Sequence, residues 1–201
     1  MTILNDILWI TLLFNLIHFT YGLLFIPFNS FIYIFIPFIY YHILGLVLYY
    51  IHWLGHIKID NKNWLFFWYR HHKILHHHYS GERFLFTPIY KRSNIYRFTD
   101  LVTYGGGSVI CLFLLQCLFN LNVSHLLLIA FYFLNHVILL YYIHRKIHKL
   151  NPVFDKYGWF RSIRRLHYIH HEDHTKNLGI VDFSFDILLN SLDYSERIHV
   201  K

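Results

Sequence analysis

The chain has 201 residues, of which 56% are hydrophobic and 14% are charged, and its net charge is +7. The charged fraction is well below the roughly 25% of an ordinary soluble domain, and the length predicts one domain, residues 1–201. The two cysteines, Cys111 and Cys117, lie in one apolar run, which argues against a disulfide framework and against a cysteine-based metal site.

Long uncharged apolar runs predict an all-α integral membrane fold with four transmembrane helices in two hairpins. A turn at Pro27 to Ser30 separates the first two runs, and Asn120 to Asn122 separates the last two. A polar, aromatic segment from Lys58 to Asp100 divides the hairpins, and the chain after Ile143 is polar again. The predicted spans cover residues 7–26, 31–57, 104–121 and 123–143.

The basic residues predict how these spans are oriented. All 18 lysines and arginines fall between Lys58 and Arg97 or between Arg145 and Lys201. The positive-inside rule places both segments, and with four spans also the N-terminus, in the cytosol. The predicted localisation is therefore a multi-pass membrane, that of the endoplasmic reticulum in a eukaryotic cell. The positive charge then reflects membrane orientation, and nucleic acid is not an expected partner.

Histidines form four clusters at the ends of these runs or just beyond them. Two clusters are pairs four residues apart, in HWLGH and HRKIH, and each pair is followed by a triplet. Side chains three or four residues apart share one face of a helix, so each cluster points its imidazoles in one direction. The ten candidate metal ligands are His52, His56, His72, His76, His77, His144, His148, His167, His170 and His171.

Ten imidazoles are too many for one ion, and two ions with about five nitrogen ligands each fit them better. Iron is the metal expected for oxygen chemistry, although zinc binds the same ligands and the sequence does not separate the two. Glu172, Asp173 and Asp182 are the expected acceptors for the second ring N–H of ligating histidines. Isolated histidines inside the runs are interpreted as structural, namely His18, His42, His125 and His136.

The order of the clusters, HWLGH, HKILHH, HRKIH and HYIHH, resembles the membrane fatty acid hydroxylase superfamily, which includes sterol desaturases. RFLFTP at Arg83 to Pro88 and GIVDFSFD at Gly179 to Asp186 are similar to motifs of its fatty acid and ceramide 2-hydroxylases. The chain departs from that pattern in having three residues between His72 and the pair that follows it. The resemblance covers His52 to Asp186 and implies a cytosolic helical cap that carries a di-metal site.

The resemblance implies a di-iron oxygenase that uses O2 to hydroxylate a membrane lipid, with 2-hydroxylation of a fatty acid or sphingolipid as the reaction. A sterol desaturase or sterol oxidase is the alternative, and a histidine-rich zinc-binding or transport protein is the remote one. The chain has no flavin or nucleotide motif, so its electrons are expected from a separate donor such as cytochrome b5 with its reductase. Arg161, Arg164 and Arg165 form the basic patch expected to dock such an acidic donor.

Overall fold

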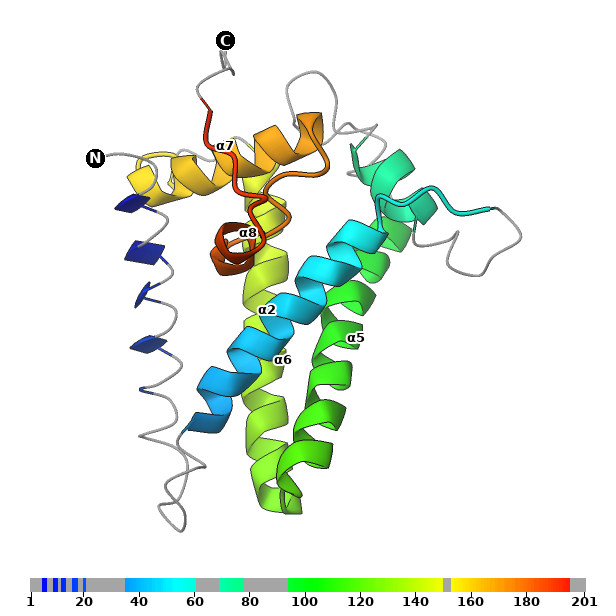
Figure 1. Ribbon diagram of the computed structural model, residues 1–201, viewed down its shortest axis with the longest axis vertical. Helices are drawn as coiled ribbons and strands as arrows, with labels where there is room; N and C mark the ends of the chain where they lie inside the picture. The colour runs from blue at the N-terminus through cyan, green and yellow to red at the C-terminus, as the bar shows by residue number, and fades with distance from the viewer. Residues whose placement is uncertain are drawn as a thin grey trace.

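The computed structural model describes residues 5–6, 9–10, 12–13, 16–17, 20, 35–60, 69–77, 94–149 and 153–195. Every regular element in these ranges is a helix. Three long helices lie side by side: α2 spans Ile36–Leu54, α5 spans Asn94–Phe119 and α6 spans Val123–Ile147 (Figure 1). A core of buried apolar side chains, with Tyr40, Leu44, Leu115 and Phe133 among them, joins all three helices.

Local sequence explains where these helices begin and end. Pro37 lies in the first turn of α2, where its missing N–H would have no helical partner in any case. α5 ends at Phe119 because Asn120 adopts the left-handed backbone conformation, with φ of 45°, that asparagine tolerates best after glycine. The chain then reverses into α6, so α5 and α6 form a hairpin about the Asn-Leu-Asn turn.

The three glycines of α5 lie inside the helix and do not interrupt it. Gly107 faces α2, where an added Cβ atom would lie 2.9 Å from Leu48 Cδ2. A Cβ atom at Gly105 or Gly106 would meet nothing within 4 Å. Only the third glycine is therefore needed for the close approach of α5 to α2.

Two shorter helices cover one end of the three long ones. α7, Gly158–Glu172, lies across the end of α6, and α8, Ser184–Leu188, lies beside α2 (Figure 1). Ile163, Leu166 and Ile169 recur every three residues on the buried face of α7 and pack with Ile143 and Ile147 of α6. The same face carries His167 and His170, so apolar packing fixes where those imidazoles point.

Arg164 joins α7 to the end of α6. Its Nε donates to the Ile147 carbonyl at 3.0 Å, and one terminal nitrogen donates to the Lys149 carbonyl at 2.6 Å. The other terminal nitrogen pairs with Asp155 at 2.5 Å. A guanidinium satisfies the last helix carbonyls well, because they carry partial negative charge. Arg164 is therefore occupied within the fold.

The α5–α6 hairpin carries large exposed apolar residues. Val109 and Phe113 lie four residues apart on α5, and Leu127 and Phe131 lie four apart on α6, each about two-thirds exposed. Residues with this spacing share one face of a helix. Each of these two helices therefore presents an apolar face to its surroundings.

The helices that the structure describes contradict the prediction of four membrane spans. The predicted multi-pass localisation is wrong for the same reason. Among these residues, no helix combines the length and the apolar character that crossing a membrane requires. The spans were predicted from uncharged apolar runs, but α2 contains four tyrosines and two histidines among its 19 residues. α5 begins ten residues before the predicted third span, in the polar sequence NIYRFTD. Most of the first predicted span lies outside the described residues.

Candidate metal centre

Four helices bring all four histidine clusters together. His52 lies in the last turn of α2 and His56 in the turn just after it, and His144 and His148 are placed in the same way at the end of α6. The triplets come from α7 and from η2, a π-helix over Arg70–His77. Because a π-helix has more than four residues in each turn, His76 and His77 both lie about one turn after His72. The extra residue in this cluster is thus accommodated by the wider helix.

Nine of the ten predicted ligands form two groups in which the candidate ligand atoms all lie within 4.8 Å of one another. We name them the first and the second histidine group. The first group consists of His52, His56, His72, His77 and His170. The second group consists of His76, His148, His167 and His171.

In the first group the Nε2 atoms converge. His56 Nε2 lies 3.0 Å from His72 Nε2 and 3.1 Å from His170 Nε2, and His77 Nε2 lies 3.3 Å from His72 Nε2. A neutral imidazole has one N–H and one lone pair, so such a set cannot satisfy every nitrogen by mutual hydrogen bonds. Converging lone pairs at this spacing are the arrangement that a metal ion accepts.

The tenth predicted ligand, His144, joins the second group from one side. His167 Nε2 lies 3.0 Å from His148 Nε2 and 3.1 Å from His144 Nε2. The two groups are neighbours, since the rings of His77 and His171 stack with centroids 3.9 Å apart. Each group could therefore hold a metal ion, and the two candidate sites adjoin.

Backbone carbonyls set the tautomers of two first-group histidines. His52 Nδ1 lies 2.5 Å from the Leu178 carbonyl oxygen, and His170 Nδ1 lies 2.8 Å from that of Lys176. A carbonyl oxygen only accepts, so each Nδ1 carries the proton and each Nε2 presents a lone pair to the group. His52 Nε2 is buried without a hydrogen-bond partner, which fits a metal ligand and is costly for a structural histidine.

The carboxylates expected to accept these ring protons bond elsewhere. Asp173 accepts from the backbone N–H and the hydroxyl of Thr175. Asp182 accepts from the backbone N–H and the hydroxyl of Ser184. Glu172 bonds to the Tyr168 hydroxyl. Backbone acceptors produce no residue signal, so the sequence offered no means of finding Lys176 and Leu178.

Other histidines differ in their relation to the site. His174 stacks on His56 with ring centroids 4.7 Å apart and donates from Nδ1 to the His170 carbonyl, so it borders the first group. His42 and His136 belong to neither group and contact aromatic side chains of α2, as their structural interpretation requires. His18 and the side chains of His71, His78 and His125 lie outside the described residues.

Burial keeps the site histidines neutral. It lowers the pKa of His52 from 6.5 to about 4, and it lowers the pKa values of His72 and His170 well below 6.5. Neighbouring imidazoles add to the effect on His72 and His170, because each ring resists a second positive charge nearby. Neutral imidazole is the form that binds metal, so the groups are ready for an ion at neutral pH.

The metal-free protein is expected to lose stability as the pH falls below 6.5. In the unfolded chain these histidines bind protons at their ordinary pKa, whereas the folded chain keeps them neutral, so acid favours unfolding. Each such histidine contributes roughly 1.4 kcal/mol per pH unit, and for His52 the window extends down to about 4. Urea midpoints of metal-free protein between pH 7 and 5 measure this effect, and a flat profile contradicts it.

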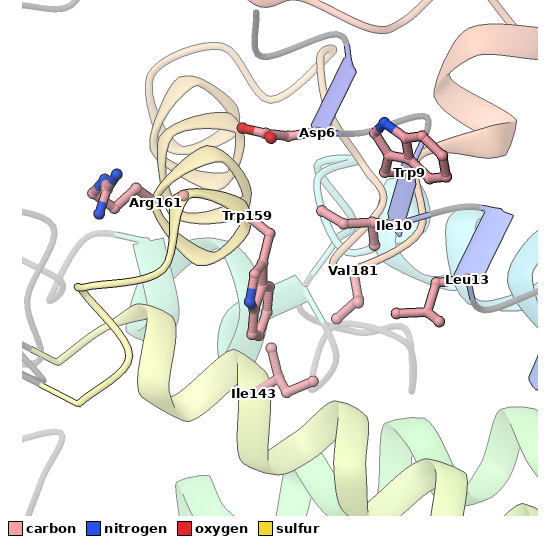
Figure 2. A pocket seen from close by; sticks show the side chains of 9 residues that line it. Asp6, Trp9, Ile10, Leu13, Ile143, Trp159, Arg161 and Val181 are labelled. Atoms are coloured by element: carbon pink, nitrogen blue, oxygen red, sulfur yellow. The ribbon is translucent and has the colours of Figure 1, made fainter. Parts of the chain in front are cut away.

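A cavity of about 700 Å³ lies at the start of α7, apart from the histidine groups (Figure 2). Trp159 of α7 extends toward Ile143 of α6, while the Arg161 side chain points away from the other labelled residues. Ile143 directly precedes His144. The lining is mainly apolar and contains none of the ten candidate ligands; it consists of Asp6, Trp9, Ile10, Leu13, Ile143, Gly158, Trp159, Arg161 and Val181.

Comparison with family models, with curated proteins and with solved structures finds no match for this chain. The two histidine groups, which could hold metal ions, are the chemically distinctive feature of the described residues.

Proposed function

We propose that the protein is a di-metal oxygenase that hydroxylates a lipid acyl chain, with 2-hydroxylation of a fatty acid or sphingolipid as its reaction. The observation that carries the proposal is the pair of adjacent groups built from imidazole alone. Neutral ligands leave the full positive charge on two bound ions, which favours oxygen-derived anions as further ligands. The order of the histidine motifs, similar to that of fatty acid hydroxylases, agrees with this proposal.

An unactivated C–H bond cannot be broken by side-chain acids and bases. Iron ions bound by the two groups would supply the reactivity toward O2 that such a bond requires. In the overall reaction one oxygen atom enters the C–H bond and the other leaves as water, with two electrons and two protons consumed. We propose iron for this reason, although an all-imidazole set also suits zinc.

The protein's own residues supply the donors and their surroundings. His167 and His170 are fully buried, so water has little access to the ligand atoms. The carbonyls of Lys176 and Leu178 hold first-group rings with their Nε2 lone pairs inward. The apolar cavity beside Ile143 has the size and lining of a site for a lipid chain, which supports a lipid as the substrate.

The electrons are proposed to come from a separate donor such as cytochrome b5 with its reductase. Of the three arginines in the predicted basic patch, Arg161 is exposed, whereas Arg164 and Arg165 are half-buried. Arg164 pairs with Asp155 and Arg165 donates to the Ser195 carbonyl. Arg161 donates to the Asp155 carbonyl at 2.7 Å, but its side chain is exposed, so it is the arginine of the patch that a docking partner could reach.

Metal loading followed by turnover tests the proposal. Protein loaded anaerobically with Fe²⁺ is expected to hold two ions per chain by elemental analysis. Supplied with O2, cytochrome b5, its reductase and a fatty acid or ceramide, it is expected to form the 2-hydroxy product. With ¹⁸O2, mass spectrometry should find one labelled oxygen in that product. Protein loaded with Zn²⁺ is the control, and it should form none.

Each other result points to a different function. Oxidised sterols in place of 2-hydroxy acyl chains would indicate the sterol-type alternative. Two tightly bound zinc ions with no product from the iron-loaded protein would indicate a zinc protein without redox chemistry. A chain that binds neither metal would overturn the proposed centre altogether.

A further inference from the structure

One short loop contacts first-group histidines from two helices. Residues 176–179 follow α7 and lie between α7 and α8. The Leu178 carbonyl accepts from His52 of α2, and the Lys176 carbonyl accepts from His170 of α7. The orientation of both rings therefore depends on how firmly this loop is held.

Asp186, which is fully buried in α8, holds the loop with both carboxylate oxygens. Its Oδ1 accepts from the Leu178 N–H at 2.8 Å, and its Oδ2 accepts from the Gly179 N–H at 2.7 Å. The Gly179 N–H belongs to the same planar peptide group as the Leu178 carbonyl. Fixing that N–H thus fixes the direction of the carbonyl that receives the His52 proton.

The same carboxylate is linked to α2 by a second route. Ser191 Oγ donates to Asp186 Oδ1 at 2.7 Å and lies 2.9 Å from the Tyr49 hydroxyl. Tyr49 precedes His52 by three residues, about one turn of α2. Asp186 is therefore linked to His52 in two ways. One link runs through Ser191 and Tyr49 to helix α2, and the other runs through the Leu178–Gly179 peptide to the His52 ring.

Asn177 makes the loop rigid on its other side. Its backbone is left-handed, with φ of 50°, and its side-chain amide donates to the Leu166 carbonyl at 3.1 Å. Its side-chain oxygen accepts from the Asp193 N–H at 2.8 Å. Because the loop is tied to α7 and to the segment after α8, Asp186 acts on a structure with little freedom to adjust.

We infer that Asp186 is a positioning residue for the metal ion of the first group. Through the Leu178–Gly179 peptide it holds His52 with Nδ1 protonated and Nε2 directed at the ion, and through the loop it steadies His170. Hydrogen bonds in series strengthen one another in a buried setting, so the carboxylate also raises the basicity of the His52 ligand atom. This inference rests on the proposed metal centre and adds a residue that contacts neither ion.

Asp186→Asn is the direct test, because it keeps the side-chain volume but turns one acceptor into a donor that faces a backbone N–H. Asp182→Asn is the matched control: Asp182 lies in the same segment, and its carboxylate bonds to Ser184. Metal-free protein is titrated with Co²⁺ and followed by calorimetry and by the visible absorption of the bound ion. A carboxylate that supports a metal ligand indirectly is typically worth about 10- to 100-fold in affinity.

We expect Asp186→Asn to weaken the binding of one of the two Co²⁺ ions by about 10- to 100-fold and to change the absorption spectrum of that ion. The other ion should bind with the affinity and spectrum seen in the parent, and the Asp182→Asn control should bind both ions as the parent does. Ser191→Ala removes one of the three hydrogen bonds to the carboxylate and serves if Asp186→Asn does not fold. We expect Ser191→Ala to weaken the binding of the same ion by a smaller factor, about 3- to 10-fold.

Two unaltered ions in a folded Asp186→Asn protein, or in Ser191→Ala if that variant has to serve, would overturn the inference. A separate measurement applies even if the parent binds no Co²⁺ and the proposed centre fails. In ¹⁵N NMR spectra of the metal-free parent, His52 should be protonated at Nδ1, and the variants should lose that preference. Retention of the parent tautomer in the variants would then refute the positioning role independently of the metal.

Discussion

His170→Ala is expected to remove one metal ion from the protein and to reduce acyl-chain hydroxylation to background. His170 is fully buried, its Nε2 lies 3.1 Å from His56 Nε2, and its Nδ1 proton is held by a carbonyl, so its ring is fixed as a ligand of the first group. Removing a residue that only supports a metal ligand typically weakens metal binding by about 10- to 100-fold. Removing a ligand itself should cost more, so we expect more than about 100-fold weaker binding of this ion. Elemental analysis after dialysis should fall from two ions per chain to one.

Paired variants show which group loses its ion. His167→Ala should empty the second group instead, because His167 Nε2 is the atom that both His144 and His148 approach. The double variant should hold no ion. His42→Ala is the control, since His42 lies on α2 but belongs to neither histidine group, and it should keep both ions. Two full-occupancy ions in His170→Ala would contradict the assignment of the first group.

Gly179→Ala is expected to destabilise the protein by about 3 kcal/mol or more and to weaken the first-group ion with it. A Cβ atom at this position would lie 2.3 Å from the Asp182 carbonyl oxygen and 2.7 Å from Asp186 Oδ2. The first atom is backbone and the second belongs to a carboxylate held by three hydrogen bonds, so the loop itself has to shift. That shift should also displace the Leu178 carbonyl from His52.

Thermal and urea unfolding of the metal-free protein measure the first effect, and Co²⁺ titration measures the second. Gly106→Ala is the matched control, because its Cβ would meet nothing within 4 Å in the middle of α5. Alanine is about 0.5 to 1 kcal/mol better than glycine inside a helix, so that variant should be slightly more stable than the parent. Equal stability of the two alanine variants would show that the loop around Gly179 is not tightly packed.

The prediction of membrane spans is overturned by the helices that the structure describes, none of which is long and apolar enough to cross a membrane. α2 carries tyrosine and histidine among its apolar residues, and α5 begins in a polar sequence, so a long run without lysine, arginine, aspartate or glutamate does not by itself establish a membrane span. The helical nature of these segments depends instead on local backbone preferences and on apolar contacts among them. Those contacts are present in the core that joins Leu44, Leu115 and Phe133.

The supporting contacts of the site illustrate a second limit. Acidic residues near the last histidine triplet were reasonable acceptors, but Asp173 and Asp182 bond to a threonine and a serine two residues further on. The acceptors in the structure are main-chain carbonyls, which every residue has. Only the path of the loop, held by Asp186, determines which carbonyls meet His52 and His170.

The sequence by itself determined the chemistry of the ligands and their helical spacing, because residues three or four apart share one face whatever the helix packs against. The tertiary structure alone decided how the imidazoles divide between two ions. His72 and His77 of η2 join the first group while His76 joins the second, whereas α7 gives only His170 to the first group and gives His167 and His171 to the second. This division of the histidines arises where the four helices meet. The histidine faces of η2 and α7 each lie between the histidine pair at the end of α2 and the pair at the end of α6. How these helices cross depends on contacts between residues far apart in the chain.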